Sequence, residues 1–163
     1  MSNTMTLIWQ AIQDEFSDLS DVSHVTRIVL RLTLASVLGG LLGFEREQRG
    51  KSAGVRTHML VAIGAALFVL IPQQVGASST DLSRVLQGLI AGVGFLGAGA
   101  IIMGNREVET RGLTTAASIW VTAAIGVAAG VGRESTAVLS TLIALLILSV
   151  VPWISRTKKQ KKE

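Results

Sequence analysis

The chain has 163 residues, of which 49% are hydrophobic and 16% are charged, and its mean hydropathy is +0.53. Soluble domains average about 25% charged residues, so this composition excludes an ordinary water-soluble domain. The absence of cysteine also excludes disulfides, thiolate nucleophiles and cysteine-based metal sites. We therefore predict an all-α protein that spans a membrane.

The pattern of apolar residues within 1–23 predicts an amphipathic helix on the outer face of the membrane. Apolar side chains recur at helical spacing: Met5, Ile8, Trp9, Ile12, Phe16 and Leu19. The segment carries four acidic residues and no Lys or Arg, so it lacks the basic start of a signal peptide and is expected to stay in the mature chain. It either contacts a partner or lipid, or simply lies on the membrane and caps the bundle.

Five apolar runs follow, each close to the roughly 20 residues that cross a bilayer as a helix. They lie at about 24–44, 57–75, 84–103, 111–130 and 135–154. We predict a polytopic membrane bundle of five transmembrane helices over residues 24–154, and a basic cytoplasmic tail over 155–163.

Basic residues are concentrated on one side of this predicted topology. Of the 15 Lys and Arg residues, 11 would share a side with the C-terminus: Arg46, Arg49, Lys51, Arg56, Arg106, Arg111, Arg156, Lys158, Lys159, Lys161 and Lys162. Because cytoplasmic loops carry the excess of positive charge, we place the N-terminus outside and the C-terminus in the cytoplasm.

The third run contains the stretch LIAGVGFLGAGAII, with four glycines and no charge. A dinucleotide-binding loop would need a preceding strand, but this stretch is enclosed by an apolar run over 85–103. Small residues permit close packing between helices in lipid, so we predict that this run is the central helix. Its glycines could instead let backbone carbonyls approach an ion. Across the chain, the predicted packing glycines are Gly39, Gly43, Gly88, Gly92, Gly94, Gly97, Gly99, Gly126 and Gly130.

A polar line runs along one face of the fourth run, at Arg111, Thr115, Ser118 and Thr122. These hydroxyls either bond to carbonyls of the preceding turn or face a partner helix or a water-filled path. Outer-side polar residues are Arg31, Arg84 and Gln87. Arg31 either snorkels to the outer surface or pairs within the bundle.

The cytoplasmic ends of the first four runs predict a polar cluster. Its members are Glu45, Arg46, Arg56, Thr57, His58, Arg111, Thr114 and Thr115. One carboxylate among several arginines suits a structural clasp, or a site for anions or a partner's acidic residues, better than a magnesium cage. His24 and His58 fall at opposite ends of neighbouring runs, so we predict no metal site. No HExxH, GxSxG or DxxD motif within a run is present, so we predict no cofactor and no enzymatic activity.

The motifs together resemble the transmembrane domain of the MgtC/SapB family over roughly residues 27–134. The matching blocks, in order, are GLLGFERE (40–47), AGVRTHMLV (53–61), RVLQGLIAGVGFLGAG (84–99) and RGLTTAA (111–117), with Trp120 and AAIG (123–126) beyond. The family positions carried over are Glu45, Arg46, Arg56, Thr57, Arg84, Gln87, Gly92, Gly94, Gly97, Gly99, Arg111, Gly112, Thr114, Thr115 and Trp120.

The resemblance implies a bacterial inner-membrane protein associated with low magnesium, acid stress or growth inside host cells, and hence with virulence. It implies a regulator that binds other membrane proteins, with the F-type ATP synthase as a candidate partner. The alternative is a magnesium or other ion transporter or channel, which the absence of Asp or Glu within the runs disfavours. Many relatives carry a soluble domain after the last span, whereas this sequence ends at Glu163.

We expect membrane lipid and a second copy of the chain as partners, with a dimer favoured, and no nucleic acid.

Overall fold

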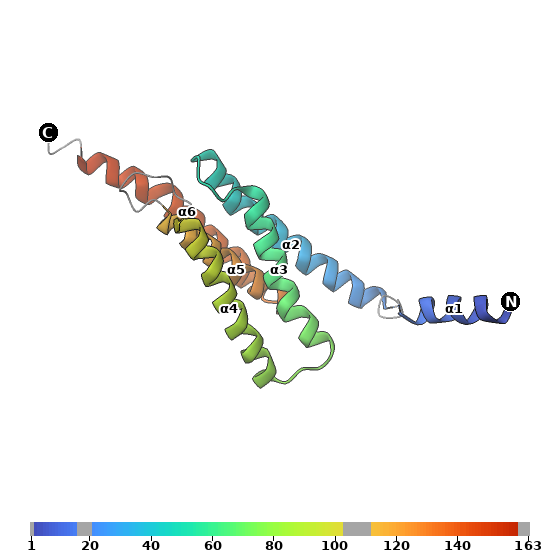
Figure 1. The fold of residues 1–163 in the computed structure, drawn as a ribbon. Coiled ribbons are helices and arrows are strands. Elements are labelled where there is room, and N and C mark those ends of the chain that lie inside the picture. The colour runs from blue at the N-terminus through green and yellow to red at the C-terminus, as the bar shows by residue number, and fades with distance from the viewer. Residues whose placement is uncertain (1, 16–20, 103–111, 160–163) are drawn as a thin grey trace. The chain divides into compact units, whose positions relative to one another are not determined.

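The computed structural model describes residues 2–15, 21–102 and 112–159, and the side chains of 4–15, 21–101 and 112–151 among them. These residues form the helices α1 (Ser2–Glu15), α2 (Val22–Gln48), α3 (Val55–Gln74), α4 (Ser79–Ile102), α5 (Leu113–Gly130) and α6 (Glu134–Lys159), and no strand among them (Figure 1). The last five are long and apolar enough to cross a membrane. The predicted all-α bundle with five spans is confirmed.

Residues 1–30 and 31–163 form two separate compact units. In the first, α1 is helical as predicted, and Met5, Ile8, Trp9 and Ile12 are all exposed. The other two predicted apolar positions, Phe16 and Leu19, lie outside the described residues. The second unit contains the packed helices described below.

Three helices in this unit end in the same way, with a glycine in the left-handed region: Gly50 (φ 63°), Gly76 (φ 71°) and Gly132 (φ 80°). At Gly132, the glycine N–H donates to the Ala129 carbonyl and the next N–H, from Arg133, donates to the Ala128 carbonyl. The same pair of bonds recurs at Gly50 and Gly76. This Schellman arrangement satisfies the last carbonyls of a helix, and glycine adopts it without steric cost. It produces the tight turns that reverse the chain.

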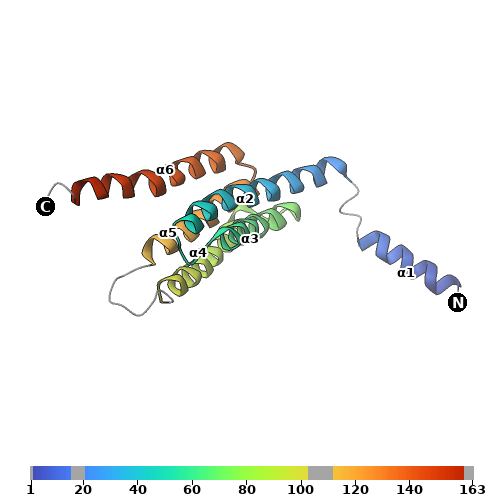
Figure 2. The same cartoon turned by 90° about the horizontal axis from the view of Figure 1, so that it is seen from above.

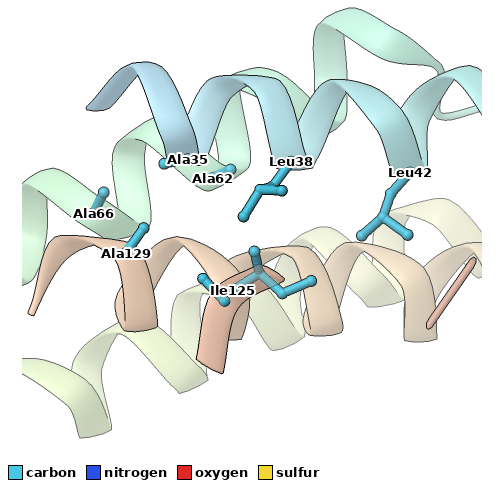
Figure 3. Packing of buried hydrophobic residues seen from close by; sticks show 8 residues of the cluster. Ala35, Leu38, Leu42, Ala62, Ala66, Ile125 and Ala129 are labelled. Carbon is cyan, nitrogen blue, oxygen red and sulfur yellow. The ribbon is translucent and has the colours of Figure 1, made fainter. Parts of the chain in front are cut away.

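Helix α5 lies between two apolar cores. The first joins α2, α3, α5 and α6 through Ala35, Leu38, Leu42, Ala62, Ala66, Ile125, Ala129 and Ala137 (Figure 3). The second, on the other side of α5, joins α3, the turn before it and α4 to α5 through Ala53, Ala65, Val93, Ile119 and Ala123. Small side chains predominate in both cores, which lets the helix backbones approach closely.

The prediction that the third run is the central helix is wrong. Of the most apolar 18-residue window in each span, 50% is buried in α5 and 11% in α4. Small residues make a helix face able to pack closely, but they do not determine whether the chain itself supplies the partner. In α4, most of that face is left open.

Helices α2, α3, α5 and α6 each have one terminus at a common end of the bundle. Figure 1 shows the turn between α2 and α3 at the end opposite the α3–α4 loop. Figure 2 shows α6 running along the bundle, with its last turns beyond the start of α5. The described members of the predicted polar cluster therefore fall at one end of the bundle, as the alternation of spans requires.

Candidate functional site

A compact ion cluster lies at the end of α2. Nε and Nη2 of Arg46 both lie 2.5 Å from Glu45 Oε2, and Arg49 Nε lies 2.6 Å from Glu45 Oε1. The Arg49 contact is a charge contact rather than an aligned hydrogen bond, since Oε1 has no hydrogen-bond partner within the described residues. Arg46 is only 2% exposed. One carboxylate thus serves two guanidinium groups, and the cluster keeps a net positive charge.

Glu47 holds the turn between α2 and α3. Its Oε2 accepts a hydrogen bond of 2.9 Å from the backbone N–H of Val55, the first residue of α3. A carboxylate at this position satisfies an otherwise unpaired N–H and interacts favourably with the helix dipole. The Glu47 side chain also occupies the space that a Cβ at Gly54 would need. We did not predict this role; the available signal was an acid close before a helix start that has glycine as its N-cap.

His58 connects α3 to α5 in the interior. The ring is fully buried, with Nδ1 3.0 Å from the Gly54 carbonyl oxygen and Nε2 3.2 Å from Ser118 Oγ. Because a carbonyl can only accept, Nδ1 carries a hydrogen. His58 therefore belongs to an interhelical polar contact with Ser118, which the predicted cluster did not include.

The hydroxyls of the polar line are buried and bond mainly within their own helix. Ser118 Oγ lies 2.8 Å from the Thr115 carbonyl oxygen, and Thr122 Oγ1 lies 2.8 Å from the Ser118 carbonyl oxygen. Thr115, Ser118 and Thr122 are each at most 5% exposed. Ser118 and Thr122 thus contact carbonyls of the preceding turn, as the first interpretation predicts, and Ser118 also faces a neighbouring helix through His58, as the second allows.

The rest of the predicted cluster does not join this interior contact. Arg56, Thr57 and Thr114 are exposed, and Arg111 lies outside the described residues. The prediction therefore separates into an ion cluster on Glu45, a buried contact through His58, and an exposed set.

Arg31 pairs within the bundle. Its Nη1 donates to the carbonyl oxygen of Gly130 at 3.1 Å and to Gln73 Oε1 at 3.5 Å, and its Nε lies 3.8 Å from Glu134 Oε1. A cation at the end of α5 complements the negative end of that helix dipole. Of the two predicted alternatives, pairing within the bundle is the one that these contacts show. Arg84 forms a separate, exposed pair with Asp81 at 3.9 Å. Gln87 is also exposed.

Four of the predicted packing glycines lie where helices nearly touch. A Cβ would come within 2.6 Å of the His58 carbonyl oxygen at Gly39 and within 2.6 Å of Val55 Cα at Gly43. At Gly126 and Gly130 it would collide with the carbonyl oxygens of Ala62 and Ala66 in α3. Only glycine allows these approaches of α2 and α5 to α3.

The α4 glycines behave differently. Within the described part of the chain, a Cβ added at Gly88, Gly92, Gly94 or Gly99 meets no atom within 4 Å. At Gly97 it makes an ordinary contact of 3.5 Å with Ala116 Cβ. A tighter approach, which we did not predict, occurs at Gly112, where an added Cβ would lie 2.7 Å from the Ala100 carbonyl oxygen. Within this part of the chain, Gly97 therefore packs against α5, whereas the packing prediction is not met at Gly88, Gly92, Gly94 and Gly99.

Gly88 and Gly92 line an apolar groove between α3 and α4, which we call the α3/α4 groove. Its volume is about 640 Å³. It is lined by Leu60, Val61, Gly64, Ala65, Phe68, Val85, Gly88, Leu89, Gly92, Val93 and Leu96. Gly88 and Gly92 lie four residues apart on α4 and form a GxxxG pair on the wall of this groove.

Comparison with known proteins identifies relatives for most of the chain. The MgtC family model matches residues 32–157. A protein named "Putative magnesium transporter YhiD" from Escherichia coli is 42% identical over 129 residues, covering 75% of this chain and 59% of the relative. Protein SrpB from Synechococcus elongatus is 45% identical over 132 residues, covering 73% and 71%. Protein MgtC from Brucella abortus is 45% identical over 113 residues, covering 69% and 46%. No solved structure matches the chain.

The chain thus spans about half to seven tenths of the length of these relatives. The matched region contains the ion cluster, the His58–Ser118 contact and α4 with its open glycines. It also covers all four motif blocks on which the resemblance was based. This chain belongs to the MgtC family.

Proposed function

We propose that this protein is a non-enzymatic regulator of the bacterial inner membrane that acts by binding other membrane proteins through the α3/α4 groove. The observation that carries the proposal is the open GxxxG pair, Gly88 and Gly92, on a groove wall that other described residues of the chain do not fill. Between helices in lipid, close van der Waals packing replaces the hydrophobic effect, and small residues make it possible. A transmembrane helix of another protein is the occupant that fits.

The contrast between the two sets of glycines supports this proposal. Gly39, Gly43, Gly126 and Gly130 hold α2 and α5 against α3, so glycines in these helices are used for contacts. Equivalent spacing on α4 has no contact of that kind with the described residues. The surface is therefore suited to a helix from outside this part of the chain.

The biological setting follows from the MgtC/SapB resemblance. We propose a role in adaptation to low magnesium, acid or host-associated stress, with the F-type ATP synthase as the candidate partner. The positive-inside rule supports an N-terminus outside and a C-terminus in the cytoplasm. On that orientation, the ion cluster on Glu45 lies at the cytoplasmic end of the bundle.

Magnesium transport is the second candidate, because one relative is named a putative magnesium transporter. Two observations favour regulation over transport. The hydroxyls of Ser118 and Thr122 are buried and contact carbonyls of their own helix. Among the described side chains, no three His, Cys, Asp or Glu residues gather as metal ligands. Mg²⁺ prefers oxygen ligands, so a magnesium path would need oxygen donors other than a cluster of these side chains.

The test combines binding and flux measurements on the same preparations. Purified protein and purified F-type ATP synthase are reconstituted together in nanodiscs, and their association is compared for wild type, Gly92→Leu and Gly94→Leu. Leucine at 92 would fill the groove, whereas leucine at 94, also exposed, does not line it. We expect at least about tenfold weaker association for Gly92→Leu, corresponding to about 1.4 kcal/mol, and little change for Gly94→Leu.

Magnesium flux into sealed vesicles decides between the two candidates. Flux above that of empty vesicles, together with no association with the synthase, would replace regulation by transport. Equal association of both leucine variants would contradict the groove as the binding surface. Size-exclusion profiles in detergent confirm that each variant is folded before either measurement.

A further inference from the structure

A second cavity, of about 690 Å³, lies at the end of the bundle where α2 ends. We call it the basic cavity. Its walls are formed by Arg46, Gln48, Arg49, Lys51, Thr114, Ile147, Leu148 and Val151. One side is therefore lined by cations from the end of α2 and the following turn, and the other by aliphatic side chains of α6.

The cationic side of the basic cavity carries excess positive charge. Three of the lining residues are Arg46, Arg49 and Lys51, and none of the lining residues is acidic. Glu45 neutralises one charge from behind, through its contacts with Arg46 and Arg49. A net charge of about +2 remains at the wall, and Lys51 is exposed there. An anion is the ligand that this charge favours.

Arg49 is fixed in position by two contacts. Its Nε lies 2.6 Å from Glu45 Oε1, and its Nη2 donates to the Ser149 carbonyl oxygen at 3.3 Å. The bond to Ser149 connects the turn after α2 to α6. A guanidinium held in this way is pre-organised, because less conformational freedom is lost when a phosphate or carboxylate binds.

The aliphatic side is exposed although it belongs to a membrane span. Ile147 and Val151, one helical turn apart on α6, are 55% and 51% exposed. A soluble anion makes no use of such a wall, whereas the acyl chain of a lipid packs along it. The two sides together match a molecule with an anionic head and an apolar tail at the boundary between membrane and water.

We propose that the basic cavity binds the phosphate headgroup of an anionic phospholipid, with an acyl chain lying along Ile147 and Val151. The site lies at the end of the bundle that carries Arg46, Arg49, Lys51 and Arg56. On the orientation proposed above, anionic lipids of the cytoplasmic leaflet would meet these cations. This inference does not depend on the α3/α4 groove or on the identity of a protein partner. It assigns a specific lipid site to a cavity that the proposed function does not use.

The experiment measures lipid retention by native mass spectrometry of the full chain in detergent. Wild type, Lys51→Gln and Arg56→Gln are each mixed with phosphatidylglycerol or with phosphatidylcholine. Arg56 is the matched control, because it is an exposed cation at the start of α3 that does not line the cavity. Lys51 is exposed in a turn, so its substitution leaves the packed helices intact. We expect phosphatidylglycerol retention to fall about fivefold in Lys51→Gln, the effect of one cation near an anionic headgroup, and to stay at the wild-type level in Arg56→Gln.

Two further arms separate the sources of the phosphate and test the apolar wall. Glycerol phosphate carries the same headgroup chemistry without an acyl chain, and we expect it to displace no lipid at equal concentration. Val151→Ser should also weaken phosphatidylglycerol retention. Equal retention of both lipids by wild type, or equal losses in Lys51→Gln and Arg56→Gln, would overturn the proposal. Displacement by glycerol phosphate would overturn the lipid assignment in favour of a soluble phosphate site.

Discussion

At the scale of single residues, the contact between His58 and Ser118 shows how one hydrogen can be shared between two acceptors. Nδ1 of His58 donates to the Gly54 carbonyl, so Nε2 of a neutral ring must accept. Ser118 Oγ lies within reach of both His58 Nε2 and the Thr115 carbonyl oxygen, but it has a single hydrogen. The hydroxyl can point to only one of these two acceptors at a time, and its contact with Nε2 links α3 to α5.

We expect Ser118→Ala to destabilise the protein by about 1–3 kcal/mol, because it leaves a buried histidine nitrogen without a partner. Thr141→Val is the control: Thr141 is equally buried, and its hydroxyl donates only to the Ala137 carbonyl of its own helix at 2.9 Å. Thermal unfolding in detergent compares the two. Similar losses for both substitutions would mean that the His58 contact contributes no specific stability.

At the scale of the helices, glycines with the same spacing have different roles on different elements. Gly126 of α5 lies directly against the backbone of Ala62 in α3, whereas Gly92 of α4 faces open space in the described structure. A backbone neighbour cannot move aside as a flexible side chain can. The same substitution should therefore have opposite effects on the two helices.

Gly126→Ala is expected to cost about 1–3 kcal/mol or more, through overpacking of α5 against α3. Gly92→Ala is expected to be neutral or to stabilise by up to about 1 kcal/mol, because alanine favours the helix and meets no neighbour in the isolated protein. Unfolding midpoints of the two variants in detergent measure the difference. If Gly92→Ala destabilised the monomer as much as Gly126→Ala does, α4 would have to make a close contact at Gly92 that the structure does not show.

At the scale of the whole molecule, α4 leaves the second unit with a large apolar surface that its other helices do not cover. Only 11% of its most apolar window is buried, although it is long enough to span the membrane. In lipid this exposure carries little cost by itself, since lipid tails are as apolar as leucine. It does leave a helix face available for association, and a second copy of the chain is one candidate to occupy it.

We predict that, when no partner protein is present, the chain forms a homodimer through this face. Gly92→Leu should shift the mass measured by light scattering in mild detergent from dimer toward monomer, and Gly94→Leu should not, since Gly94 does not line the α3/α4 groove. The reason is steric: leucine at 92 prevents close approach of a second helix. A monomer in the wild type would contradict the dimer, and a dimer unchanged by Gly92→Leu would move its interface away from the groove.

The sequence by itself determined the helical class, the five spans and the family, because span length and apolar composition are properties of one segment at a time. The motif blocks likewise needed only the order of residues along the chain. These features survive whatever the helices pack against, and the structure and the comparisons agree with them.

Only the tertiary structure decided which helix is central and which polar groups meet. Helix α5 is enclosed because Gly126 and Gly130 let it approach α3, while the similar pattern on α4 has no such neighbour in the described residues. Two polar contacts likewise depend on how the chain folds. Glu47 bonds to the backbone of Val55, and Arg31 bonds to Gly130, 99 residues along the chain, because the fold brings these separate segments together. A face that permits close contact can be recognised from one segment, but the contact itself depends on the positions of two.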